Sequence, residues 1–327
     1  MMSGSDRSYL ITGVNGFIGS HVVLQKPKDV TFIWGTDKGP HCQVMSDNRY
    51  TSADITKSEE LTGLFREVDV VVHAAGKAHV PNSLGKDLFD RVNVTGTANL
   101  VKAAAQAGVK HFILVSSVAV YGRTGAVSVD ETCPCHPKGE YAQSKYEAEL
   151  AAIRIAESTG MALTILRLAT AYGNGDPGNV YRLLRTIQLG RFFWLGKGDN
   201  LKSLIHVEDI ARAIWAVSLR SATGIHIFNV SSPPSFMRDV VNIISENFGR
   251  RKPCVGIPSF FARLIAKGVS LLPNPFMFQL KELIQKWLSH DVYDGSQFER
   301  TYGFIPKVKL TVGLRREVAW FRRLKIR

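Results

Sequence analysis

The stretch at residues 9–20 constrains the fold more than any other part of the chain. Its sequence, YLITGVNGFIGS, has the pattern of an apolar strand, a glycine turn and the start of a helix. Gly13 suits a sharp bend, Gly16 the close approach of a pyrophosphate, and Gly19 tight packing of the helix on the strand. Because N–H groups at the start of such a helix face the phosphates, the stretch predicts a dinucleotide site. The alternative is a turn with only a structural role.

Strands and helices alternate through the first half of the chain. Apolar runs at 30–34, 68–74, 112–117 and 163–168 are separated by helical segments at 17–25, 87–108 and 141–158. We therefore predict an α/β fold with a Rossmann-type, doubly wound parallel sheet over residues 1–171. From residue 172 the pattern loosens. We predict a smaller C-terminal α/β substrate-binding lobe over residues 172–327, with an interleaved boundary and a basic C-terminal helix.

Composition excludes several classes of protein. The chain has 327 residues and is 45% hydrophobic, but no apolar run reaches the length of a membrane span without a charge. Residues 1–7 lack the apolar core of a signal peptide. The four cysteines are scattered without metal-like spacing, so we expect free thiols, no metal and a cytoplasmic location.

The formal net charge is +13, and the tail at 307–327 carries eight lysines and arginines. The simpler interpretation is a docked terminal helix with a solvated basic face. The alternative is a weak peripheral contact with anionic membrane lipid. Because no nucleic-acid-binding motif accompanies the charge, we expect no nucleic-acid partner.

Asp37 follows the second predicted strand at the distance typical of a ribose-binding carboxylate. A carboxylate there accepts hydrogen bonds from the adenosine ribose and favours NAD over NADP. Lys38 is the competing signal, because a lysine could meet the 2′-phosphate of NADP. The sequence therefore predicts NAD, with NADP as the alternative.

Tyr141 and Lys145 form a Y-x-x-x-K pair on a predicted helix, where residues four apart lie on one face. A lysine beside a tyrosine favours the phenolate and lowers the pKa of the tyrosine. Such a tyrosine can exchange a proton with a sugar or steroid hydroxyl while hydride moves to or from a nicotinamide. Ser117, at a predicted strand end, could bind the same oxygen. These three residues are our predicted catalytic set; a surface Tyr/Lys pair is the alternative.

Further motifs occur in a characteristic order. They are TGxxGFIG at 12–19, ADI at 53–55, HAA at 73–75, NVxGT at 93–97, SSxxVYG at 116–122, YxxxK at 141–145, LR at 166–167 and HVxD at 206–209. In these motifs the chain resembles the extended short-chain dehydrogenases/reductases of the NAD-dependent epimerase/dehydratase family.

The resemblance implies roles for particular residues. It places Ser117, Tyr141 and Lys145 in the catalytic set, and Asn179 and Lys202 at the diphosphate of a nucleotide sugar, although the family usually has arginine at the latter position. His79 either lines the sugar pocket or is a loop histidine without a role. The predicted cofactor-binding residues are Gly13, Asn15, Gly16, Phe17, Ile18, Asp37, Asp54, Ile55, Ala74, Ala75, Asn93, Tyr141 and Lys145, with Asp54 and Ile55 beside the adenine.

Departures from the family pattern bear on the activity. Sugar 4,6-dehydratases of the family carry an Asp-Glu pair after the catalytic Ser/Thr, where this chain has Val118 and Ala119, so a dehydratase is not expected. The segments at 76–80 and 293–321 look most like bacterial nucleotide-sugar 4-keto reductases that serve surface polysaccharide synthesis. We therefore expect an NAD(P)-dependent oxidoreductase acting at C4, of the 4-keto-6-deoxy nucleotide-sugar reductase type. The alternatives are a UDP-sugar 4-epimerase, of the UDP-glucose or UDP-N-acetylglucosamine type, and a dinucleotide-binding regulator without turnover.

Family members often dimerise through the helices that correspond to 87–108 and 141–158. By this resemblance we expect a homodimer. The small apolar residues that we expect in its interface are Leu100, Val101, Ala104, Ala105, Ala148, Ala151 and Ala152.

Overall fold

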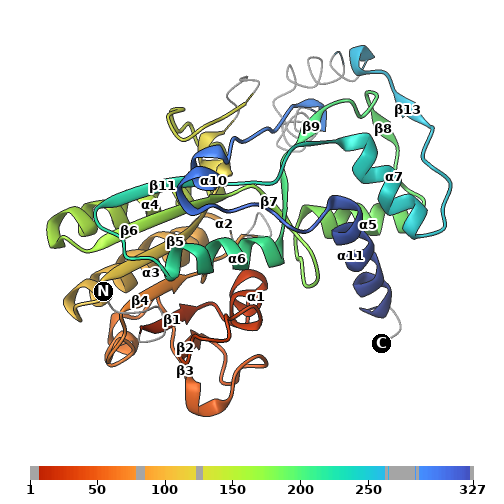
Figure 1. Cartoon of the computed structure of the whole chain (residues 1–327). Coiled ribbons are helices and arrows are strands. Elements are labelled where there is room, and N and C mark those ends of the chain that lie inside the picture. The colour runs from red at the N-terminus through yellow and green to blue at the C-terminus, as the bar shows by residue number, and fades with distance from the viewer. Residues whose placement is uncertain are drawn as a thin grey trace.

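A seven-stranded parallel sheet forms the centre of the computed structural model, which describes residues 7–78, 85–122, 128–261, 264, 284 and 287–324. The strand order is β11-β6-β5-β4-β1-β2-β3, and all neighbours are parallel (Figure 1). The strands are β1 (Ser8–Thr12), β2 (Phe32–Asp37), β3 (Tyr50–Ser52), β4 (Val70–His73), β5 (His111–Ser117), β6 (Ala162–Leu168) and β11 (Ile225–Val230). The order reverses between β1 and β4, the point where open α/β sheets bind ligands.

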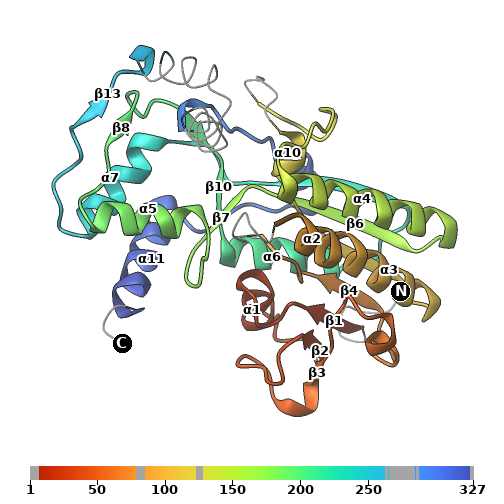
Figure 2. The ribbon, with the colours of Figure 1, turned by 180° about the vertical axis from the view of Figure 1, so that it is seen from behind.

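Both faces of the sheet are covered by helices, which is why its strands are apolar almost throughout. Tyr9 and Ile11 of β1 pack into one core with α6, whereas Leu10 faces the opposite core with α3. One face carries α1 (Phe17–Leu24) and α6 (Val207–Ser218), and the other carries α3 (Gly96–Gln106) and α4 (Glu140–Thr159) (Figure 2). The doubly wound fold predicted from the sequence is confirmed.

The predicted helix at 87–108 is more complex than expected. It consists of α2 (Gly85–Phe89), a π-helical segment at Asp90–Thr95 and then α3. π-Helical turns are rare and often occur at functional sites. Short 3-10 helices lie at Asp47–Arg49, Ser58–Leu61 and Val118–Tyr121.

The second half of the chain builds a smaller lobe beside the carboxyl ends of the strands (Figure 1). Its helices α5 (Asn179–Gln188), α7 (Met237–Asn247) and α11 (Leu310–Leu324) enclose a separate core. Its short strands are β7 (Thr170–Tyr172), β8 (Trp194–Leu195), β9 (Leu201–Lys202), β10 (Leu204–His206), β12 (Ser235–Phe236) and β13 (Gly256–Ile257).

The two halves of the chain interleave. β11 lies far beyond residue 172 but pairs with β6 in the main sheet, and α10 (Ser296–Tyr302) packs on β11. α6, also from the second half, is tied to α1 by a hydrogen bond from Trp215 Nε1 to the Val22 carbonyl, 2.9 Å. Segments from both halves therefore contribute to the main sheet and to its helical cover.

Candidate active site

Ser117, Tyr141 and Lys145 lie together at the carboxyl end of β5. Ser117 is the last residue of β5, and the other two lie on the first turns of α4, which packs against that strand. The Ser117 side chain acts on the Tyr141 hydroxyl, where it opposes the rise in pKa that burial causes, and its Oγ accepts a hydrogen bond from Ala119 N at 3.2 Å. Lys145 is 8% exposed, and its Nζ donates to the Val115 carbonyl at 2.6 Å. The structure thus brings the predicted catalytic residues into one site.

Burial controls the protonation of this site. It raises the pKa of Tyr141, and the effect of the Ser117 side chain only opposes that shift. It lowers the pKa of Lys145 to about 8, with the nearby Glu149 carboxylate acting in the other direction. The expectation that Lys145 lowers the tyrosine pKa is wrong for this structure, because burial dominates and the ammonium group is held by a backbone carbonyl. Tyr141 is therefore a protonated donor at neutral pH.

A buried ion pair involves the helix that carries two of the predicted catalytic residues, α4. Glu149 and Arg167 are joined by a contact of 2.7 Å, and their side chains are 1% and 5% exposed. Ser116 donates a hydrogen bond to the same carboxylate, and the guanidinium lies 4.8 Å from the centroid of the Tyr121 ring. Sequence reasoning missed Glu149; its spacing of four residues from Lys145 on one helix was the available signal.

The glycine turn has the geometry that a pyrophosphate cradle requires. Gly13 has φ +73°, and a Cβ there would lie 2.6 Å from the Ala75 nitrogen. A Cβ at Gly19 would lie 2.1 Å from the Gly13 carbonyl oxygen, so α1 can approach β1 only without a side chain. Gly16 caps α1 without a side-chain hydrogen bond, which leaves the N–H groups of the helix start for an anion.

Asp37 lies at the opening of this cradle. It is the last residue of β2, not beyond the strand as expected, and its Oδ2 accepts a hydrogen bond from Asn15 N at 3.0 Å. Lys38, the competing signal for a 2′-phosphate, pairs with Asp54 at 2.9 Å. Burial raises the pKa of Asp54, but hydrogen bonds from Lys38 and Thr56 outweigh it and bring the pKa to about 2.

The other predicted cofactor residues follow the carboxyl ends of β1, β3 and β4. Phe17 and Ile18 are half-buried on the first turn of α1, and Ala74 and Ala75 are half-buried just after β4. Ile55 is 7% exposed and packs in the core.

Asn93 is buried in the π-helical segment, and its side-chain amide is hydrogen-bonded to other residues of the chain. Its Oδ1 accepts from Lys77 N at 2.8 Å, and its Nδ2 donates to Ser144 Oγ at 2.9 Å. The amide thereby ties the loop after β4 to the catalytic helix α4.

His73 has a structural role. It is 1% exposed and hydrogen-bonded to both Thr12 and Thr97, at 2.8 and 3.0 Å. Burial, together with the nearby Lys145, lowers the pKa of His73 to about 3. The neutral imidazole thus links β1, β4 and α3 beneath the cofactor face.

The predicted substrate residues lie on the smaller lobe. Asn179 is the exposed first residue of α5, whose start is held by Asp176 through hydrogen bonds from Gly178 N at 2.6 Å and Tyr181 N at 3.0 Å. Lys202, on β9, pairs with Asp291 at 2.5 Å. His79 lies outside the described residues.

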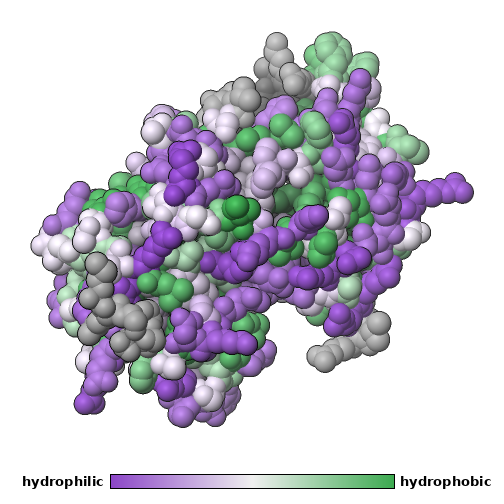
Figure 3. Space-filling view, viewed as in Figure 1, coloured by the Kyte–Doolittle hydropathy of each residue, from purple (hydrophilic) through white to green (hydrophobic). Residues whose placement is uncertain are grey.

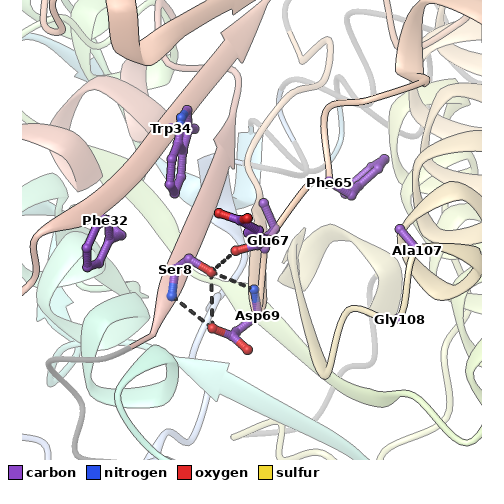
Figure 4. Close-up of a pocket in the computed structure, with 9 residues that line it drawn as sticks. Ser8, Phe32, Trp34, Phe65, Glu67, Asp69, Ala107 and Gly108 are labelled. Atoms are coloured by element: carbon purple, nitrogen blue, oxygen red, sulfur yellow. Dashed lines mark hydrogen bonds between the residues drawn. The ribbon is translucent and has the colours of Figure 1, made fainter.

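A cavity of about 450 Å³ lies at the other end of the sheet (Figure 4). Ser8 and Phe32, which line it, are the first residues of β1 and β2, and Asp69 precedes β4. The predicted catalytic residues lie instead at the carboxyl ends of the strands. This cavity is therefore separate from the candidate active site.

Comparison with known proteins agrees with this geometry. The NAD dependent epimerase/dehydratase family matches residues 9–231 of the chain. The chain belongs to this family. A relative from Escherichia coli O157:H7, N-acetyl-alpha-D-glucosaminyl-diphospho-ditrans,octacis-undecaprenol 4-epimerase, is 30% identical over 256 residues, which cover 76% of this chain and 75% of the relative.

Two further members extend the likeness over nearly the whole chain. A dTDP-glucose 4,6-dehydratase from Streptomyces griseus is 28% identical over 333 residues, covering 95% of this chain and 93% of that protein. The solved structure of MoeE5 in complex with UDP-glucose and NAD has a TM-score of 0.76 at 25% identity and covers 97% of this chain and 99% of that one.

NAD is the cofactor of this family. The close glycine packing, the uncapped start of α1 and the carboxylate of Asp37 all fit a dinucleotide. Among the described residues, no group of three or more His, Cys, Asp or Glu could hold a metal ion. Within the same part of the chain, no helix combines the length and hydrophobicity that crossing a bilayer requires.

Proposed function

We propose that the protein catalyses NAD-dependent oxidoreduction at C4 of a sugar carried on a diphosphate, and that it works as a 4-epimerase. The observation that carries this proposal is the placement of Ser117 and Tyr141 at the carboxyl end of β5, with Lys145 one helical turn further along α4. The start of α1, which fits the cofactor, lies at the same edge of the parallel sheet. Family membership and the names of the relatives support the substrate class.

The chemistry follows from a proton and a hydride leaving the same alcohol. When bound, NAD supplies the hydride acceptor and returns the hydride. Tyr141 exchanges the proton of the C4 hydroxyl, and Ser117 donates a hydrogen bond to the same oxygen. Lys145, one helical turn further along α4, would hold the ribose of the nicotinamide. Asn179, the exposed first residue of α5, would contact the diphosphate.

An epimerase returns the hydride to the opposite face of C4, so that no net oxidation occurs. A dehydratase would need carboxylic groups beside the keto sugar to remove water. The positions after Ser117 hold Val118, which is 6% exposed, and Ala119. Neither side chain can transfer a proton, which supports chemistry confined to C4.

A 4-keto-6-deoxy nucleotide-sugar reductase is the second candidate. It would use the same three catalytic residues but consume one reduced cofactor for each ketone. The resemblance of the segments at 76–80 and 293–321 favours it. The two candidates differ in whether the cofactor stays bound between turnovers.

The test begins with the purified full chain and the absorbance and mass of any nucleotide that remains with it after gel filtration. UDP-glucose, UDP-N-acetylglucosamine and a polyprenyl-diphosphate-linked N-acetylglucosamine are then supplied without added cofactor, the last because the E. coli relative is named for such a substrate. Retained NAD with interconversion at C4 supports the epimerase. Loss of NAD(P)H absorbance only with a 4-keto-6-deoxy nucleotide sugar supports the reductase instead. No reaction with any of these would contradict the proposal.

A further inference from the structure

Six large apolar side chains are exposed on the smaller lobe, around β8 and β13. They are 44–73% exposed and form what we call the apolar rim: Leu189, Phe193, Val255, Phe260, Phe261 and Leu264. Figure 3 shows apolar surface at the upper right, the part of this view where Figure 1 places β8 and β13. Large solvent-exposed apolar groups of this kind mark a contact surface.

Local structure brings the rim residues together and turns them outward. β8 pairs with β13, and Trp194 N donates to the Val255 carbonyl at 2.9 Å. The ring of Phe192 lies 5.7 Å from that of Trp287 and 4.9 Å from that of Trp194, whereas Phe193 between them is 53% exposed. The rings of Phe260 and Phe261 lie 5.6 Å apart.

The rim is surrounded by positive charge. Residues 185–199 and 246–261 contain six lysines and arginines against two acidic residues. These cations are all exposed: Arg185, Arg191, Lys197, Arg250, Arg251 and Lys252. A Cβ at Gly190 would lie 3.2 Å from Nη1 of Arg250, which places the basic run directly beside the Leu189 end of the rim.

We propose that the apolar rim docks on the surface of an anionic lipid bilayer. Aromatic and aliphatic side chains enter the boundary between headgroups and acyl chains, and the surrounding cations meet lipid phosphates. Among possible partners, a bilayer matches both features at once. A symmetric contact between two copies of the chain would bring the two basic clusters toward each other, which disfavours a second copy. This proposal does not depend on the reaction catalysed.

The experiment measures co-sedimentation of the full chain with vesicles of phosphatidylcholine alone and of phosphatidylcholine mixed with phosphatidylglycerol. We expect binding to the anionic vesicles, at least about tenfold weaker binding to the neutral ones, and loss of binding at high salt. The double variant Phe260→Ser/Phe261→Ser should bind the anionic vesicles at least about tenfold more weakly, because it lacks two rings that become buried in the bilayer on binding. The double variant Arg250→Ser/Arg251→Ser should bind the anionic vesicles more weakly, and its binding should depend less on the salt concentration.

Two control variants separate the rim from other surfaces. Phe32→Ser removes a ring that is 47% exposed at the far end of the sheet and should bind vesicles as the unchanged protein does. Arg322→Ser/Arg323→Ser removes charge from the basic end of α11. The thermal unfolding midpoint and NAD binding of each variant confirm that it is folded.

The proposal is overturned if the unchanged protein does not bind anionic vesicles. It is also overturned if the Phe260→Ser/Phe261→Ser variant binds them as well as the unchanged protein does, or if only the Arg322→Ser/Arg323→Ser variant loses binding. A chain that ignores vesicles but is a dimer in solution, and becomes a monomer in the Phe260/Phe261 variant, would also overturn it and assign the rim to a second copy.

Discussion

Tyr141 shares the catalytic helix with a second tyrosine, Tyr146, which offers a matched comparison. Burial raises the pKa of Tyr141 and the Ser117 side chain opposes that rise, whereas Tyr146 packs with a small cluster that includes Val120. Removing the Tyr141 hydroxyl should lower the turnover number for C4 chemistry by about 10²–10⁴-fold, because no side chain then exchanges a proton with the C4 oxygen. Tyr141→Phe should still fold and retain NAD.

The measurement is steady-state turnover of the three proteins on the substrate identified above. Tyr146→Phe should stay within a few-fold of the unchanged chain. Equal losses of turnover in Tyr141→Phe and Tyr146→Phe would show that Tyr141 does not transfer the proton.

Glu317 is a buried acid outside the candidate active site. It lies on α11, is 0% exposed, and neither carboxylate oxygen has a hydrogen-bond partner among the described residues. Burial, and then the negative charge of Asp176, raises the pKa of Glu317 to about 9. Glu317 is therefore protonated in the folded chain at neutral pH.

This raised pKa predicts how stability depends on pH. Between about pH 4.5 and 9 the folded chain keeps a proton that the unfolded chain releases, so the free energy of unfolding falls as the pH rises, by up to about 1.4 kcal/mol per pH unit from this group. Glu317→Gln, which cannot ionise, should lack that contribution. Urea unfolding of both proteins at several pH values should show a difference that grows in favour of the variant with pH. Parallel curves would show that Glu317 is ionised in the folded state.

The ion pair of Glu149 and Arg167 joins three elements. Glu149 lies on α4, Arg167 lies on β6, and Ser116 of β5 donates a hydrogen bond to the Glu149 carboxylate. Glu149→Gln would leave the guanidinium charge buried without its counter-ion. We expect a loss of about 3–5 kcal/mol in the free energy of unfolding. Urea unfolding checks it, with Glu157→Gln, an exposed position on the same helix, expected to change stability by less than about 0.5 kcal/mol. A loss no larger than that of the control would show that the pair is not needed to hold α4.

The sequence predicted the main elements because their signals are local. An apolar run such as β4, which is buried at all its positions, and the glycine turn before α1 can each be recognised within a dozen residues. The contacts that sequence reasoning missed join distant positions. Thr12, His73 and Thr97 form one hydrogen-bonded chain, and no periodicity links those three positions before the sheet is assembled.

The smaller lobe was less predictable for the same reason. Its core combines α5, α7 and α11, which are separated by long stretches of chain, and Lys202 meets an acid 89 residues away in the sequence. The sequence shows that a cation stands at position 202. Its partner Asp291 follows from the tertiary fold alone.

The interface of the expected homodimer cannot consist of the small apolar residues that the sequence analysis assigned to it. Of the seven small apolar residues expected in the interface, six are at most 7% exposed and pack within the chain itself: Leu100, Val101, Ala104, Ala148, Ala151 and Ala152. Helical spacing reveals an apolar face, but it does not distinguish a face that meets a sheet from one that meets another chain. Ala98 and Leu150 remain partly exposed on α3 and α4.

We still predict a homodimer, now through these outward faces of α3 and α4. Light scattering at micromolar concentration should then give twice the chain mass of 36.2 kDa. Leu150→Glu should give a monomer, because a charge in the centre of such an interface loses its hydration without gaining a partner. Leu324→Glu introduces the same charge at a side chain that is 47% exposed on α11, and should remain a dimer. A monomeric unchanged chain would contradict the prediction, and a dimer that survives Leu150→Glu would place the interface on another surface.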